Sequence, residues 1–373
     1  MIPYSRQTID QSDVRTVLWV LNSEYLTQGP KILKFEKALS RACGARYAVA
    51  VSSGTAALHL AYLAAGLEKG NEVITTPNTF AATANMLLAV GAKPIFCDIR
   101  QDTYNVDEKQ IERLINKRTK AIVPVHFAGQ PCDMDAILRI ARKHKLIVIE
   151  DACHALGARY KNRKIGSLGS DMSVFSFHAV KAITTGEGGA ILTDNKIFYQ
   201  KLLLQRTHGI SKNHQGKNIM TTLGYNYRLT DIQAALGISQ LQKLDKFIKM
   251  RRQISTWYRS ELKDLQAVIL PKEVKGNNSG WHLYVILLKN SSLRDSLWSY
   301  LRGKGIGANF HYPAVYGHPY YRKIGYQKTK LPVMEDYQRS CLTLPCYPAL
   351  SRRQVGFIAR TIKQFFIKHG KAH

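Results

Sequence analysis

The sequence has no uncharged apolar run close to the roughly 18 residues that a membrane-spanning helix needs. Its first ten residues, MIPYSRQTID, contain neither the basic start nor the apolar core of a secretion signal. These two absences predict a soluble protein of the cytoplasm with no membrane partner.

Cysteine is scarce and scattered. The 373 residues contain six cysteines, with no CxxC pair and no companion histidines at ligand spacing. Zinc sites and disulfide frameworks depend on such spacings, so the pattern argues against both. We expect buried, reduced thiols and no metal.

Acidic residues are also few. The chain has 26 Asp and Glu against 54 Lys and Arg, a formal net charge of +28 at pH 7. Such a positive field attracts nucleic acids or small polyanionic substrates, although a basic bias of the whole proteome would give the same excess without a function. The stretch from Ser351 onward holds six of these basic residues, and its apolar spacing predicts a packed amphipathic helix with a basic outer face.

Short β-branched runs alternate with helical patterns between about residues 50 and 195. The predicted strands cover residues 72–76, 93–99, 120–127, 146–152, 172–178 and 188–194. This alternation predicts an α/β fold with a mainly parallel sheet and helices on both faces. Ligands of such sheets bind beyond the carboxyl ends of the strands. That rule selects Phe80, Asp151, His154, Ser176 and Lys181.

The pattern changes after residue 195. Thr230, with Gln233 three residues later, is a capping-box signature for one long helix through LTDIQAALGISQLQKLDKFIKMRRQISTWYRSEL. A smaller α+β region follows, with expected strands at residues 281–288 and 308–312, a helix between them and the final basic helix. We predict a large domain over residues 1–240, whose N-terminal segment folds back near the site, and a small C-terminal α+β domain over residues 241–373.

Three features at the strand ends carry chemistry. The turn Ser53, Gly54, Thr55 would place free backbone N–H groups at a helix N-terminus, which suits a phosphate but is also a common structural cap. Asp151 is either a cap of the next turn or a carboxylate kept ionised by a positive partner. Lys181 is either a solvated charge or a held nucleophile. Together, the three features are the parts that a pyridoxal phosphate (PLP) site requires.

Eight motifs follow one another at a particular order and spacing. They are LTQGP, SSGTAALHL, TPNTFAATANMLL, VHFAGQPCDM, EDACHALGA, SFHAVKAITTGEGG, GYNYRLTDIQAALG and HLYVI. In this order they resemble the DegT/StrS family of sugar-nucleotide aminotransferases, from residue 1 to the stretch LPCYPAL. The resemblance implies a fold type I PLP-dependent aminotransferase, a homodimer with shared active sites, and a cofactor that alternates between PLP and pyridoxamine phosphate (PMP).

The resemblance also implies roles for single residues. Lys181 would bind the cofactor covalently as a Schiff base, Asp151 would pair with its ring nitrogen, and His154 would lie near its 3-oxygen. The remaining implied cofactor contacts are Ser53, Gly54, Thr55, Phe80, Ser176 and Asn226 of the partner subunit. The positions that match the sugar-nucleotide pocket are Tyr4, Tyr25, Leu26, Thr27, His311, Tyr312 and Pro313. These side chains can equally be core or interface packing, and Arg228 is either a substrate contact or part of a structural salt bridge.

The stretches IPYSRQTID, ITTGEGG and HYPAVYGHPYY carry a narrower likeness within the family. It implies transfer of an amino group from L-glutamate to C4 of a UDP-linked 4-keto-6-deoxy-N-acetylhexosamine in pseudaminic acid biosynthesis. The alternatives are the D-xylo epimer or a dTDP-linked ketosugar. A related dehydrating enzyme would carry histidine in place of Lys181. A basic nucleic-acid-binding regulator on the same scaffold is a different class, but no nucleic-acid motif is present, and we expect no nucleic-acid partner.

Overall fold

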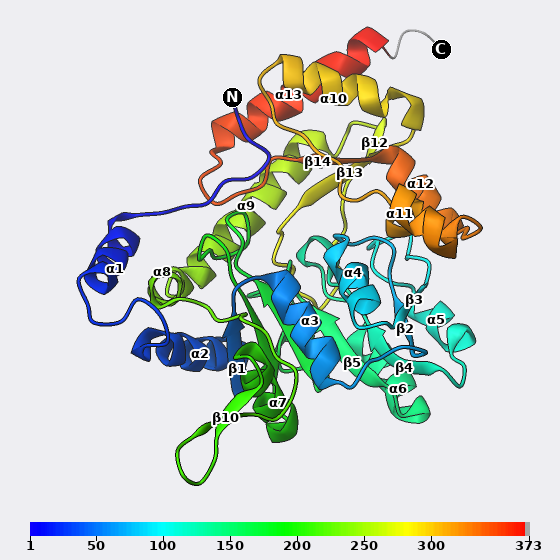
Figure 1. Ribbon diagram of the computed structural model, residues 1–373. Coiled ribbons are helices and arrows are strands. Elements are labelled where there is room, and N and C mark those ends of the chain that lie inside the picture. Colours follow the sequence, from blue (N-terminus) through cyan, green and yellow to red (C-terminus); the bar gives the residue numbers. More distant parts are fainter. Residues whose placement is uncertain (370–373) are drawn as a thin grey trace.

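A mainly parallel sheet of seven strands forms the centre of the computed structural model, which describes residues 1–369 (Figure 1). In sheet order the strands are β1 (Tyr47–Val51), β9 (Gly189–Thr193), β8 (Met172–Ser176), β5 (Ile147–Asp151), β4 (Thr119–Val123), β2 (Glu72–Thr75) and β3 (Lys93–Phe96). Strand β9 runs antiparallel to β1 and β8, and the other neighbouring pairs are parallel. The predicted α/β class with a mainly parallel sheet is confirmed, and each predicted strand of this region overlaps an observed one.

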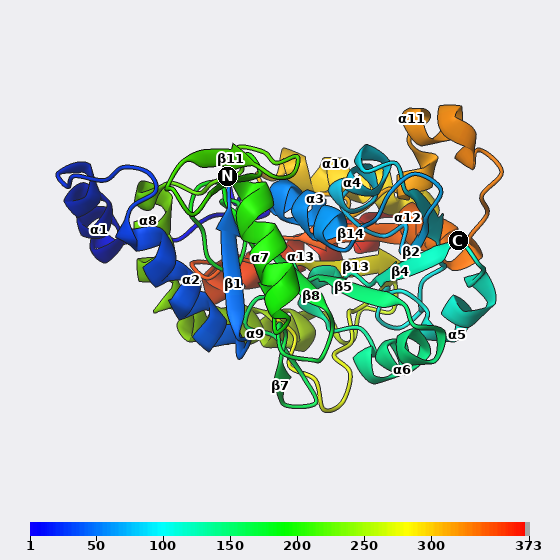
Figure 2. The same ribbon diagram turned by 60° about the horizontal axis from the view of Figure 1, so that its bottom comes forward.

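Alternate residues of each strand face two different hydrophobic cores, because side chains along a strand point to opposite faces. In β1, Ala48 and Ala50 belong to one core, whereas Val49 and Val51 belong to the other. The first core is covered by α2 (Pro30–Cys43), α6 (Met134–His144), α8 (Asp231–Leu241) and α9 (Leu244–Leu262). The second is covered by α3 (Gly54–Ala64), α4 (Ala82–Ala89) and α7 (Lys196–Arg206). Helices therefore cover both faces, as predicted (Figure 2).

Two helices, α8 and α9, replace the single long helix predicted after Thr230. The capping box is confirmed, because the Thr230 hydroxyl accepts from the Gln233 N–H and the Gln233 side chain accepts from the Thr230 N–H. The helix is interrupted at residues 242–243, where the Lys243 ammonium pairs with Asp10 at 2.6 Å and with Asp13 at 2.8 Å. These contacts connect the break to the N-terminal segment, and α9 then runs from the first core into a third one around Tyr258.

A three-stranded antiparallel sheet builds the C-terminal region, in the order β12 (Val268–Ile269), β13 (Tyr284–Leu288) and β14 (Cys341–Leu344). It packs with α10 (Arg294–Gly303) and α13 (Arg352–His369), both predicted. The predicted strand at residues 308–312 is wrong. Asn309 makes only an isolated bridge to Thr343, and residues 309–313 line a cavity instead. The domain boundary near residue 240 stays a prediction, and the last four residues of the predicted small domain lie outside the described residues.

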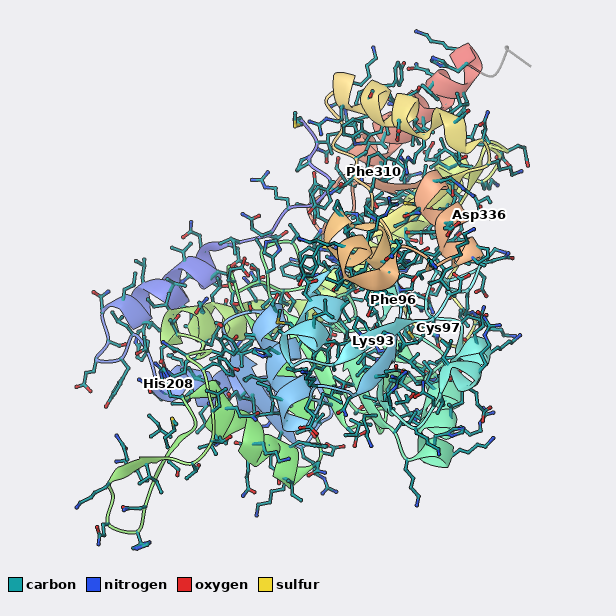
Figure 3. The ribbon with its side chains drawn as sticks, turned by 45° about the vertical axis from the view of Figure 1, so that its right-hand side comes forward. Lys93, Phe96, Cys97, His208, Phe310 and Asp336 are labelled. Atoms are coloured by element: carbon teal, nitrogen blue, oxygen red, sulfur yellow. The ribbon has the colours of Figure 1, made fainter. Side chains whose placement is uncertain are left out.

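Peripheral elements surround these sheets. They are α1 (Gln11–Leu21), α5 (Glu108–Ile111), β6 (Arg159–Tyr160), β7 (Arg163–Lys164), β10 (Ile210–Lys212), β11 (Asn218–Met220), α11 (Pro319–Tyr321) and α12 (Pro332–Ser340). The β10–β11 hairpin projects away from the body, with His208 near its base, whereas Phe96 at the end of β3 lies beside α11 (Figure 3). Among residues 1–369, no helix is long and apolar enough to cross a bilayer, and no cluster of acidic, histidine and cysteine side chains suits a metal ion.

Candidate active site

A cavity of about 670 Å³ lies beyond the carboxyl ends of β5 and β8. It brings together most of the side chains predicted from the sequence. Those lining it are Tyr4, Ser53, Gly54, Thr55, Phe80, Asp151, His154, Ser176, Lys181, His311, Tyr312 and Pro313. The N-terminal segment folds back to the site as expected, because Tyr4 reaches the cavity and its carbonyl accepts from the Cys346 N–H.

The turn before α3 faces this cavity with unpaired donors. The Ser53 hydroxyl accepts from the Ala56 N–H at 3.0 Å, while Gly54 and Thr55, the first two helical residues, have no intrahelical acceptor for their N–H groups. A Cβ on Gly54 would lie 2.9 Å from the Ser176 Cβ, so only glycine allows the helix to approach the end of β8 this closely. The N–H groups, the helix dipole and the Ser176 hydroxyl together suit a phosphate.

Asp151 ends β5 and is held in one orientation. Its side chain is 5% exposed and lies on the sheet face covered by α4. The Thr83 hydroxyl of α4 donates to Oδ2 at 2.6 Å, and the Cys153 N–H donates to Oδ1 at 3.2 Å. Since both oxygens accept hydrogen bonds, the carboxylate is fixed at the cavity wall, where it can stabilise a cationic ring nitrogen.

Lys181 lies in the turn that follows β8 and is partly buried. Burial lowers the pKa of its ammonium group, and the charge of Arg251 lowers it further, while Cys153 and Asp151 act in the opposite direction. A lowered pKa increases the fraction of neutral amine, which is the form that attacks a carbonyl. The arrangement therefore fits a held nucleophile and not a solvated charge.

Three buried histidines line the cavity near Lys181. The Tyr312 hydroxyl lies 3.2 Å from His154 Nε2, and the rings of His154 and His282 are 4.3 Å apart. Burial lowers the pKa of His154 and His282 well below its usual value and that of His311 to about 4, so all three imidazoles are neutral at pH 7. Sequence reasoning gave no role to His282 or to Thr83, although both lie within the family motifs quoted for the resemblance.

Five predicted site residues lie outside this cavity. They are Tyr25, Leu26, Thr27, Asn226 and Arg228. Tyr25 and Leu26 are about half exposed, and Asn226 is exposed. The Arg228 guanidinium makes no ion pair within residues 1–369, so the structural salt bridge considered for it is not formed inside the chain.

A buried lysine, a fixed carboxylate and a helix N-terminus, gathered at one edge of a mainly parallel sheet, are the groups that a PLP-dependent enzyme requires. The chain belongs to the DegT/DnrJ/EryC1/StrS aminotransferase family, whose model matches residues 7–363. It is 41% identical over 378 residues to the UDP-4-amino-4,6-dideoxy-N-acetyl-beta-L-altrosamine transaminase of Campylobacter jejuni, with both chains fully covered.

Solved structures agree with this assignment. Helicobacter pylori PseC, an aminotransferase involved in the biosynthesis of pseudaminic acid, superposes with a TM-score of 0.94 at 37% identity and covers 98% of this chain and 99% of its own. A Streptococcus pneumoniae protein in its PMP form gives a TM-score of 0.95 at 29% identity, with 99% and 100% coverage, and it was also solved in a PLP form. The enzyme is thus a PLP-dependent sugar aminotransferase of fold type I that acts on a nucleotide sugar.

Proposed function

We propose that this enzyme transfers the amino group of L-glutamate to C4 of a UDP-linked 4-keto-6-deoxy-N-acetylhexosamine, in pseudaminic acid biosynthesis. The observation that carries the proposal is the single cavity that holds Lys181, Asp151 and the phosphate turn, in a chain similar over its whole length to the Campylobacter jejuni transaminase. A cytoplasmic location stays a prediction.

The chemistry assigned to each side chain follows from its surroundings. PLP, when bound, supplies an electron sink for a carbanion next to the transferred nitrogen. The Asp151 carboxylate, fixed by Thr83, keeps a proton on the ring nitrogen. The Lys181 amine, whose neutral fraction is increased by burial, would hold the cofactor and could accept and return a proton at the donor's α-carbon. Gly54 and Thr55 would hold the phosphate through their N–H groups.

The lining of the cavity favours an uncharged sugar with an anionic tail. The imidazoles of His154, His282 and His311 are neutral, so each can donate one hydrogen bond and accept another from sugar hydroxyls and needs no charged partner. Burial also raises the pKa of Tyr4, which keeps this phenol neutral. The net charge of +28 would attract the diphosphate from a distance.

A homodimer is part of the proposal. Apolar side chains of the hairpin region are exposed, with Met220 at 70% and Leu223 at 67%, close in sequence to the exposed Asn226. In a two-fold dimer each subunit would place the same segment on its neighbour, so both sites would be completed in the same way. We expect Asn226, Arg228 and Tyr25 to act on the neighbour's cavity in this arrangement.

The identity of the sugar is the most specific part of the proposal, and a comparison of candidate substrates tests it. The proposed UDP-linked 4-keto-6-deoxy-N-acetylhexosamine has the L-arabino configuration. The purified enzyme is offered glutamate with this sugar, its D-xylo epimer or a dTDP analogue, and release of 2-oxoglutarate is followed. A few pocket contacts of about 1–3 kcal/mol each correspond to a roughly 10- to 200-fold preference, which we expect for the UDP-linked L-arabino sugar. A preference for the D-xylo or dTDP compound would overturn the substrate but leave the aminotransferase reaction standing.

A further inference from the structure

Arg251 is a fully buried arginine on α9, with 1% of its surface exposed. Burying a guanidinium is costly unless a carboxylate or several hydrogen bonds compensate its charge. Within residues 1–369, no Asp or Glu pairs with Arg251, and its Nε has no hydrogen-bond partner. The guanidinium is thus retained in the interior without a carboxylate partner, so hydrogen bonds to backbone carbonyls have to compensate its charge.

The Arg251 guanidinium donates only to backbone carbonyls, and these belong to three separate segments. Nη1 donates to Cys346 at 2.7 Å, His282 at 3.2 Å and Trp281 at 3.4 Å, and Nη2 donates to Val180 at 3.4 Å. Cys346 follows β14, and His282 precedes β13. Val180 directly precedes Lys181. One side chain therefore connects the lysine turn to the segment before β13, which brings His282 to the cavity, and to the segment after β14.

One of these segments has a strained backbone. Trp281 has φ of 45°, a conformation that a bulky side chain rarely adopts and that persists only where its surroundings enforce it. Two contacts enforce it here: the Arg251 hydrogen bond to its carbonyl, and a close approach that would place a Cβ on Gly129 at 2.9 Å from the Trp281 nitrogen. The next residue, His282, places its ring 4.3 Å from that of His154 in the cavity.

The surroundings of the Lys181 amine contain charges of both signs. Asp151 and Cys153 raise its pKa, whereas burial and Arg251 lower it. The other titratable side chains facing it are His154, His282 and His311, which burial keeps neutral. Arg251 is thus the permanent cation among the groups that act on this amine.

We propose that Arg251 is a positioning residue of the aminotransferase, which fixes the Lys181 amine relative to His282 and keeps a permanent positive charge beside it. The hydrogen bond to Val180 holds the lysine turn, those to Trp281 and His282 hold the segment that brings His282 to the cavity, and the one to Cys346 ties both to the end of β14. This inference rests on the proposed role of Lys181 as the residue that binds PLP.

Chemical labelling of the full-length chain tests the proposal. Trace acetylation of cofactor-free protein with acetic anhydride over a range of pH, read by peptide mass spectrometry against the exposed Lys196, gives the titration midpoint of Lys181. Loss of the cation in Arg251→Gln should raise this midpoint and so lower the neutral fraction of the Lys181 amine at pH 7. Arg251→Lys should keep the midpoint closer to that of the unaltered protein, because it keeps the charge.

The positioning role is measured separately, as the rate at which cofactor-free protein captures added PLP. We expect a fall of about tenfold in both Arg251→Gln and Arg251→Lys, because an ammonium lacks the planar fork that reaches several carbonyls. The matched control is Arg252→Gln, next on the same helix, since Arg252 is partly exposed, pairs with the partly buried Glu273 at 2.6 Å and makes no hydrogen bond to the lysine turn among the described residues. It should change neither quantity.

Two results would overturn the proposal. One is an Arg251→Gln protein with lowered thermal stability but unchanged midpoint and capture rate, which would make Arg251 purely structural. The other, which applies if Arg251→Gln does not fold, is an unchanged rate of PLP capture by Arg251→Lys, which would likewise make Arg251 purely structural. Failure of the proposed function is distinguishable, because PLP would then not become attached to Lys181 in the unaltered protein after borohydride reduction.

Discussion

The fixed carboxylate of Asp151 allows a quantitative prediction. In Asp151→Asn the side chain keeps its shape and can still bond to Thr83 and the Cys153 N–H, but it loses the charge that would pair with a protonated ring nitrogen. Removing one partner of a buried ion pair costs about 3–5 kcal/mol. At 1.36 kcal/mol for each tenfold change in rate, we expect turnover to fall by about two to four powers of ten.

The assay follows 2-oxoglutarate release from saturating glutamate and ketosugar, with bound cofactor measured by absorbance and the fold by thermal unfolding. Asp98→Asn is the matched control. Asp98 is 4% exposed, lies outside the cavity and accepts N–H donors from Ile99, Val333 and Met334. This control should lose stability without losing turnover. An Asp151→Asn enzyme that turns over nearly as fast as the unaltered one would refute the reasoning and leave Asp151 as a structural cap.

Three further predictions concern the same site. Gly54→Ala should weaken PLP binding by about tenfold or more, because the added Cβ would lie 2.9 Å from the Ser176 Cβ. The control is Gly303→Ala, whose Cβ meets nothing within 4 Å and which should leave PLP binding unchanged. Equal affinities of the two variants for PLP would contradict the prediction. His311 has a pKa of about 4 in the fold, below the unfolded value near 6.5, so the unfolded chain binds the extra proton and the free energy of unfolding should fall by about 2 kcal/mol from pH 7 to pH 5. Denaturant titrations should show a smaller loss in His311→Gln, and the same dependence on pH in both proteins would contradict the prediction. If Asn226 of the partner subunit completes each site, mixing inactive Lys181→Ala and Asn226→Ala proteins should restore about a quarter of the activity through mixed dimers, whereas no restoration would contradict a shared site.

Local sequence signals predicted much of this fold because they act over a few residues. The Thr230 and Gln233 capping box and the alternating strands depend on neighbouring side chains, and both are observed. The break after α8 was missed because the stretch through residues 242–243 contains no glycine or proline, and the contact of Lys243 with Asp10 at this point is long-range and invisible in the local pattern. The false strand at residues 308–312 has a strand-like composition, but its backbone finds only one partner, at Thr343.

The candidate site shows the same division. Lys181, Asp151 and the Gly54 turn were predictable because each lies beside a strand end, where α/β sheets bind ligands. Arg251 and His282 were not, because they come from α9 and from the start of β13 and meet the lysine turn only in three dimensions. A charged residue on a helical apolar face gives no sign in the sequence of whether it is buried.

The central claim is that Lys181 holds the cofactor, and reduction of the PLP-loaded protein with borohydride followed by peptide mapping tests it most directly. Reduction converts the link between lysine and cofactor into a stable amine, so the modified peptide reports the attachment site. The account predicts modification at Lys181, and none in Lys181→Ala, in which PLP binds without a covalent link. A modification at another lysine, or none in a protein that is yellow with bound PLP, would contradict it.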